Sequence, residues 1–125
     1  MPRTTLRPKS LDCQPRPTYP YSPGAQGGGM IFTAGQVAWD ETGEVTGVGD
    51  VAAQTRQTLN NVVAVLHEGG ASVDDVIKCN VYLADIRDFA VMNAEFAKVF
   101  PTDPPARTTV EARLAEPTML VEIEA

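Results

Sequence analysis

Two charged residues late in the chain, Arg107 and Glu122, have the types and spacing best suited to chemistry. Each lies in a run of otherwise apolar or small residues, and a short loop separates the two runs, 107–114 and 119–124. We therefore expect neighbouring strands across which the two side chains face each other. One interpretation is a cross-strand surface ion pair worth less than about 1 kcal/mol. The other is a carboxylate-binding site with a base nearby, because a guanidinium holds a carboxylate through two parallel hydrogen bonds.

The other reactive side chains indicate no nucleophilic triad, metal centre or phosphate loop. Gly27–Gly29 precede an expected strand, whereas a phosphate-binding glycine loop precedes a helix. His67 is the only histidine and lies late in an expected helix, so we expect neither a metal nor a cofactor. Cys79 alternates with apolar residues, which favours a buried, inert thiol, whereas Cys13 lies in the proline-rich segment, where exposure and oxidation are expected.

The composition fits one domain that needs no cross-links. The chain has 125 residues, of which 43% are hydrophobic and 21% charged, and a domain of this size buries roughly two-thirds of the surface of its unfolded chain. No apolar run approaches the length of a membrane span, and no signal sequence is evident. We therefore expect a cytoplasmic protein.

Charge and proline divide the chain into two parts. Residues 1–20 carry a balance of +3, which leaves −9 for the rest of a chain whose net charge is −6. Six of the ten prolines lie in the first 23 residues and forbid the amphipathic helix of a transit peptide. These features predict an irregular surface arm over residues 1–20 and a single domain over residues 21–125. The acidic domain disfavours nucleic acid as a partner.

The hydrophobic periodicity predicts an α+β domain with the order ββαβαββ. Alternation with a period of two marks strands, and apolar residues at i, i+3, i+4 and i+7 mark helices. The first half of the chain is expected to form a strand over 30–37, paired in a hairpin with a strand through Val45, and a helix from about Val51 to about Glu68. A capped turn over 72–75 and a strand over 77–83 follow. The last elements are a second helix, with Phe89, Met92, Asn93, Phe96 and Phe100 on one side, and strands over 107–114 and 119–124. We expect one mixed sheet with both helices on one face.

Such a fold leaves the second face of the sheet uncovered. The terminal strands contribute many apolar positions, among them Val110, Leu114, Met119, Val121 and Ile123. An exposed apolar face of this kind predicts self-association, with sites at the seams between subunits.

Four motifs, in this order and spacing, resemble the RidA family, also called YjgF/YER057c/UK114. They are T-A-G-Q at 33–36, D-F-A-V-M-N-A-E-F at 88–96, P-A-R-T at 105–108 and V-E-I-E-A at 121–125. The resemblance implies a chorismate-mutase-like fold and a homotrimer with three clefts between subunits. It also implies the hydrolysis of reactive enamines and imines, released by pyridoxal-phosphate enzymes, to 2-oxoacids and ammonia without a metal or cofactor. No membrane or nucleic-acid partner is implied.

The resemblance assigns roles to individual residues. Arg107 would hold the carboxylate of the substrate, and Glu122 would position or activate the water. Thr109, Gly35, Tyr21 and Phe89 would complete the substrate-binding surface.

The sequence departs from the well-studied deaminases at three positions. Our alignment places Gly24 at the tyrosine of G-P-Y, with Tyr21 as a possible substitute, Ala34 at the serine of T-S-G-Q, and Thr109 at the cysteine two residues after the arginine. Because these positions contribute to the cleft, the departures bear on the activity and on the choice of substrate.

Two functional hypotheses therefore stand beside each other. The first is an enamine/imine deaminase, and the second is a trimer that binds small carboxylates such as 2-oxoacids without turnover. Glu122 discriminates between them, because a carboxylate beside a bound carboxylate repels it unless it handles water or protons. Ribonuclease or translation-inhibitor roles are disfavoured by the net charge of −6.

Overall fold

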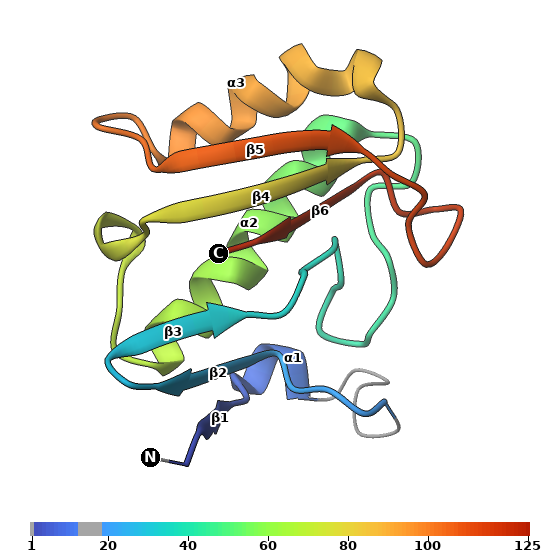
Figure 1. Ribbon diagram of the computed structural model, residues 1–125. Helices are drawn as coiled ribbons and strands as arrows, with labels where there is room; N and C mark the ends of the chain where they lie inside the picture. The colour runs from blue at the N-terminus through green and yellow to red at the C-terminus, as the bar shows by residue number, and fades with distance from the viewer. Residues whose placement is uncertain (1, 13–18) are drawn as a thin grey trace.

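The computed structural model describes residues 2–12 and 19–125, which form two small sheets and three helices (Figure 1). The elements in chain order are β1 (Thr4–Leu6), α1 (Lys9–Asp12), β2 (Gly24–Gly27), β3 (Met30–Thr33), α2 (Val51–Glu68), β4 (Lys78–Leu83), α3 (Phe89–Val99), β5 (Ala106–Glu111) and β6 (Val121–Glu124), with short 3₁₀ turns at Val73–Asp75 and Ile86–Asp88. In the described part of the chain, no helix has the length and apolarity needed to cross a membrane.

The first sheet is antiparallel in the order β1-β2-β3, and the second has the order β5-β4-β6. In the second sheet, β4 runs parallel to β5 and antiparallel to β6. The expected single mixed sheet is therefore wrong. The end of β3 and the residues after it link the two sheets, because the N–H of Thr33 donates to the carbonyl of Ala125 at 2.9 Å, and Gln36 exchanges two backbone hydrogen bonds with Ile123.

The two long helices cover one face of the second sheet, as predicted (Figure 1). The core lies between this face and the helices. Its buried members come from α2, β4, α3, the residue after α3, and β6: Leu59, Val62, Leu66, Cys79, Val81, Leu83, Met92, Phe96, Phe100, Val121 and Ile123. Helix α2 has the bounds that the sequence predicted. Asp50 caps its start by accepting from the N–H of Ala53 at 3.0 Å, and Gly70, with a φ of 82°, follows its end.

The expected irregular arm is wrong over residues 4–12. Strand β1 pairs with β2, and α1 follows it. Leu6 and Leu11 are buried against Val65 of α2, and Pro8 is the only proline of residues 4–12, so the prolines that predicted an irregular arm lie mostly outside this segment. Cys13 lies outside the described residues, and a domain boundary at residue 20 stays a prediction.

The first hairpin also differs from the prediction. It joins β2 to β3 through Gly28 and Gly29, whose φ values are 59° and 79°. Two successive residues with positive φ form the tight turn that matches the twist of antiparallel strands, and glycine adopts this conformation without steric cost. The expected pairing with the segment through Val45 is reduced to a single bridge with Trp39.

The uncovered face of the second sheet is more polar than predicted. Met119, Val121 and Ile123 are buried in the interior, and Leu114 is half-buried. Of the five apolar residues expected on this face, Val110 is the exposed one. The alternation of β6 fixes this outcome, because it turns its valine and isoleucine toward the helices and its two glutamates to the other face.

Candidate functional site

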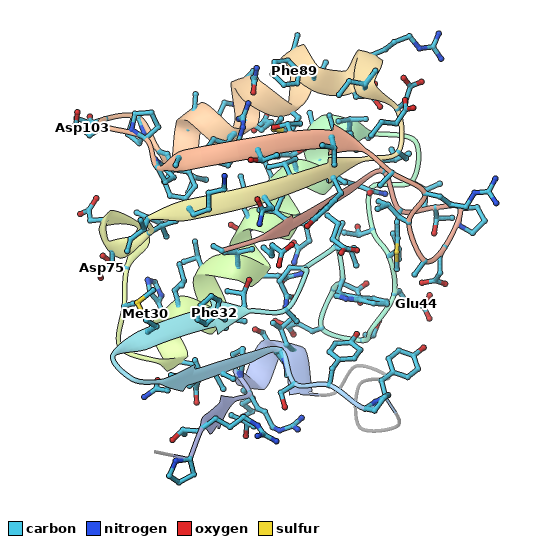
Figure 2. The ribbon with its side chains drawn as sticks, in the orientation of Figure 1. Met30, Phe32, Glu44, Asp75, Phe89 and Asp103 are labelled. Carbon is cyan, nitrogen blue, oxygen red and sulfur yellow. The ribbon has the colours of Figure 1, made fainter. Side chains whose placement is uncertain are left out.

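Arg107 lies on β5 and points toward helix α3. Its guanidinium carbon is 4.8 Å from the centre of the Phe96 ring and 5.5 Å from that of Phe89. Its Nη2 donates to Oδ1 of Asn93 at 2.6 Å. Two aromatic faces and one amide therefore orient the guanidinium through cation–π contacts and a hydrogen bond. Figure 2 shows Phe89 on this helix, above the sheet.

The environment of Arg107 suits the binding of a small anion. The side chain is half-buried and lines a groove of about 450 Å³ with Asn93, Phe96, Pro104 and Pro105. Burial lowers the pKa of Arg107 from its ordinary value, yet an arginine starts so far above neutral pH that it stays charged. Because the hydrogen bond to Asn93 and a weaker one from Nη1 to Sδ of Met92 at 3.9 Å use only part of the guanidinium, other N–H groups remain for a ligand.

Thr109 lies two residues along β5 on the same face as Arg107. It is half-buried, and its hydroxyl oxygen is shielded from solvent without a hydrogen-bond partner in the described part of the protein. The structure therefore places Arg107, Thr109 and Phe89 on one side of the second sheet, the side that carries α3.

Glu122 lies on the opposite face of the same sheet, against the backbone of Gly35. A Cβ built on Gly35 would lie 2.3 Å from Oε2 of Glu122, so any side chain at this position would displace the carboxylate from its place. Burial raises the pKa of Glu122, and the negative charge of Glu124 raises it further. Both causes favour the protonated form, so Glu122 is a stronger base than an ordinary glutamate.

Glu124 shares the open face with Glu122 and contacts a tyrosine of the neighbouring strand. The hydroxyl of Tyr82 donates to Oε1 of Glu124, and Tyr82 pairs directly with Glu122 in the register of β4 and β6. The pKa of Tyr82 is raised, first by this hydrogen bond. On this face of the sheet, Glu122 therefore lies beside the carboxylate of Glu124, which the hydrogen bond holds in place, and beside the ring of Tyr82.

Arg107 and Glu122 do not face each other within one chain. Strand β4 lies between β5 and β6, and Arg107 pairs with its Cys79 while Glu122 pairs with its Tyr82. This register separates their Cα atoms by about 14 Å, from strand rise and spacing, and their side chains leave opposite faces of the sheet. The expectation of adjacent strands, and with it an Arg107–Glu122 ion pair within one chain, is therefore wrong.

Tyr21 forms a third part of the candidate site. Its ring stacks on that of Tyr19, with centroids 5.9 Å apart, and both residues line a pocket of about 590 Å³ that also contains Ala34. Since Ala34 precedes Gly35, this pocket adjoins the backbone on which Glu122 rests. Tyr21 and Ala34 therefore line one pocket, and Gly35, the residue after Ala34, contacts Glu122.

Gly24, which our alignment places at the family's tyrosine, is buried against helix α2. A Cβ at Gly24 would lie 2.3 Å from Cγ1 of Val65, so the position has no room for a side chain. Tyr21 follows Pro20 and lines the pocket beside Ala34. That Tyr21 takes the place of the family's tyrosine stays a prediction.

Sequence reasoning missed two residues that hold Arg107, namely Asn93 and Phe96. The available signal was an asparagine on the otherwise apolar side of the second predicted helix. The interpretation of Cys79 is confirmed: it is fully buried, and burial raises the pKa of its thiol to about 11. No cluster of three potential metal ligands occurs among the residues described.

Comparison with known proteins supports the family that the four sequence motifs indicated. The family model described as Endoribonuclease L-PSP matches residues 12–125. A RutC family protein of Pyrococcus abyssi is 44% identical over 112 residues, which cover 89% of this chain and 87% of that protein. Among solved structures, the YjgF gene product of E. coli has a TM-score of 0.84 at 37% identity, with 97% of this chain and 94% of that chain covered. E. coli TdcF with bound serine has a TM-score of 0.84 at 32% identity, with 97% and 95% covered. The chain therefore belongs to the RidA family, also called YjgF/YER057c/UK114.

Proposed function

We propose that this protein is a homotrimeric deaminase that hydrolyses reactive enamines and imines to 2-oxoacids and ammonia in clefts between subunits. The observation that carries the proposal is the placement of Arg107 and Glu122 on opposite faces of one sheet. Two such groups cannot act on one small molecule within a chain, but they can meet where the α3 side of one copy approaches the open face of another. The domain over residues 21–125 and a cytoplasmic location belong to the same proposal.

Exposed apolar side chains support the self-association of the chain. Met30, Phe32 and Ile77 have 46%, 65% and 70% of their surface exposed and share a groove of about 600 Å³ beside the open face. Figure 2 shows Met30 and Phe32 on β3, next to the second sheet. Three large apolar residues gathered at one groove are more typical of an interface than of a solvated surface.

The proposed reaction follows from the residue types in the two half-sites. Arg107 would hold the carboxylate of a 2-imino acid, and an enamine would first become the imine by taking a proton on carbon and losing one from nitrogen. Water then adds to the imine carbon while Glu122 takes a proton from it and the nitrogen gains one. Collapse of this carbinolamine breaks the C–N bond, releases ammonia and forms the C=O of the 2-oxoacid. Glu122 suits the step because its raised pKa makes it a better base.

The ligand of one relative favours this class of substrate. TdcF of E. coli, at 32% identity, was solved with bound serine, which carries an amino group and a carboxylate on one carbon. An imino acid keeps the same carboxylate and nitrogen. The family description names an endoribonuclease, but a chain with a net charge of −6 is poorly suited to a phosphate backbone.

The bound serine of TdcF also favours a second candidate, a trimer that binds small carboxylates without turnover. One experiment separates the two. A dehydratase generates 2-iminobutyrate in situ, and the rate of 2-oxobutyrate release is measured with and without this protein. A faster release supports the deaminase, whereas 2-oxobutyrate binding without faster release supports the binder.

The assembly is tested independently by light scattering at micromolar concentration. We expect about three times the chain mass of 13.4 kDa. A monomer would separate Arg107 from Glu122 and would contradict the proposed cleft.

A further inference from the structure

The segment before residue 20 contributes a positively charged wall to the Tyr21 pocket. Arg3, Thr5 and Arg7 alternate along and beside β1, so their side chains leave the same face of the first sheet, and all three line this pocket. Leu6 points the other way and is buried. The pocket therefore has two arginines at one wall and Tyr21 with Ala34 at another.

These arginines have no acidic partner in the described part of the protein. The salt bridges there involve Arg56, Arg87 and Lys98, and no aspartate or glutamate is among the residues that line the pocket. Arg7 is held in place because its Nη2 donates to the hydroxyl of Ser22 at 3.0 Å. In a protein with a net charge of −6, two arginines that have no carboxylate partner among the described residues, beside a pocket of about 590 Å³, make a local site for an anion.

The pocket adjoins the proposed catalytic half-site. Ala34 lines the pocket, and the next residue, Gly35, carries the carboxylate of Glu122 against its backbone. A ligand whose reacting carbon lies near Glu122 can therefore extend a side chain toward Arg3 and Arg7. The volume of the pocket is in the range of small-molecule sites.

We propose that Arg3 and Arg7 form a subsite for a second carboxylate, so that the preferred ligands are dicarboxylic imino acids and their 2-oxoacid products. The inference rests on the proposed function for the place of the reacting carbon. Arg107 of a neighbouring copy holds the carboxylate next to the imine, and Arg3 with Arg7 holds the one at the far end. The hydrolysis is the same as for a monocarboxylic imino acid: the oxygen of water takes the place of the imine nitrogen, which leaves as ammonia.

The test compares two stable product analogues that differ in the distal carboxylate. The dissociation constants of 2-oxoglutarate and 2-oxobutyrate are measured by isothermal titration calorimetry for the wild type, R3Q, R7Q and R3Q/R7Q. We expect the wild type to bind 2-oxoglutarate about 10-fold more tightly, a factor of the size of a charge-assisted hydrogen bond, and R3Q/R7Q to bind the two equally. R113Q removes the same charge from an exposed position after β5 and should keep the preference.

Equal affinity of the wild type for the two ligands, or a preference that survives R3Q/R7Q, would overturn the subsite. Circular dichroism and light scattering on each variant exclude loss of fold or assembly, which is not expected because both arginines are exposed.

The failure of the proposed catalysis gives a different result. Glutamate oxidase generates 2-iminoglutarate in situ, and 2-oxoglutarate release is followed. Unaccelerated release together with an Arg3- and Arg7-dependent binding preference would refute the deaminase and support the subsite. Accelerated release from 2-iminobutyrate and 2-iminoglutarate without any preference would support the deaminase and refute the subsite.

Discussion

Replacement of Arg107 by lysine tests the proposed carboxylate site most directly. The substitution keeps the positive charge but replaces a planar fork by a single ammonium. In the structure the fork is oriented by Asn93 at 2.6 Å and by the rings of Phe89 and Phe96. A lysine cannot make two parallel hydrogen bonds to a carboxylate from this position.

The expected loss follows from the contacts that disappear. One charge-assisted hydrogen bond is worth about 1.5–3 kcal/mol, and a weaker cation–π contact with Phe96 adds about 0.5–1 kcal/mol. The ammonium recovers part of this sum by forming one hydrogen bond. We therefore expect R107K to lose about 1–3 kcal/mol of binding free energy, which raises the dissociation constant about 5- to 150-fold.

The assay is isothermal titration calorimetry with 2-oxobutyrate, which the protein cannot turn over. R113K, the same exchange at an exposed arginine after β5, is the matched control and should bind as the wild type does. A folded R107K protein with unchanged oligomeric mass and wild-type affinity would refute the reasoning, and Arg107 would then be a residue that packs on α3.

Four further predictions concern three other residues. E122Q keeps the size of the side chain but removes the base, so the rate of imine hydrolysis should fall about 10²- to 10⁴-fold while 2-oxobutyrate still binds; a wild-type rate would contradict the role of Glu122. Because the pKa of Glu122 is raised in the folded state, its ionisation lowers the stability of the wild type as pH rises from 4.5, the ordinary pKa of glutamate, through the folded-state pKa. The Tm of E122Q should therefore exceed that of the wild type at pH 7 and match it below pH 4.5. A lower Tm of E122Q at pH 7 would contradict the burial of this carboxylate. G24A forces a methyl group to 2.3 Å from Val65 and should lower the free energy of unfolding by about 1–3 kcal/mol in urea denaturation, whereas an unchanged midpoint would show that β2 moves aside. In a C13S background, Cys79, with a pKa of about 11 and no exposed surface, should react with a thiol reagent at pH 8 only after unfolding; rapid labelling of the native protein would contradict this.

Local pattern determined much of the fold. The period of 3.6 and the Gly69-Gly70 pair predicted α2 with its observed bounds, and strict alternation predicted β4 to within one residue. These features depend on residues that are close together in the chain, and such local patterns can be read directly from the sequence. The same holds for Cys79, whose place among alternating apolar residues indicated its burial.

The relative placement of the site residues was decided by tertiary structure. The sequence placed Arg107 and Glu122 in two runs joined by a short loop, but parallel pairing of β5 with β4 inserts β4 between them. Pairing partners and strand direction depend on contacts between distant segments, and no local pattern specifies them. The same physics decided the N-terminal segment, where prolines predicted an irregular arm but burial of Leu6 and Leu11 against α2 holds a strand and a helical turn. Only the folded chain therefore shows that the arginine and the glutamate leave opposite faces of one sheet.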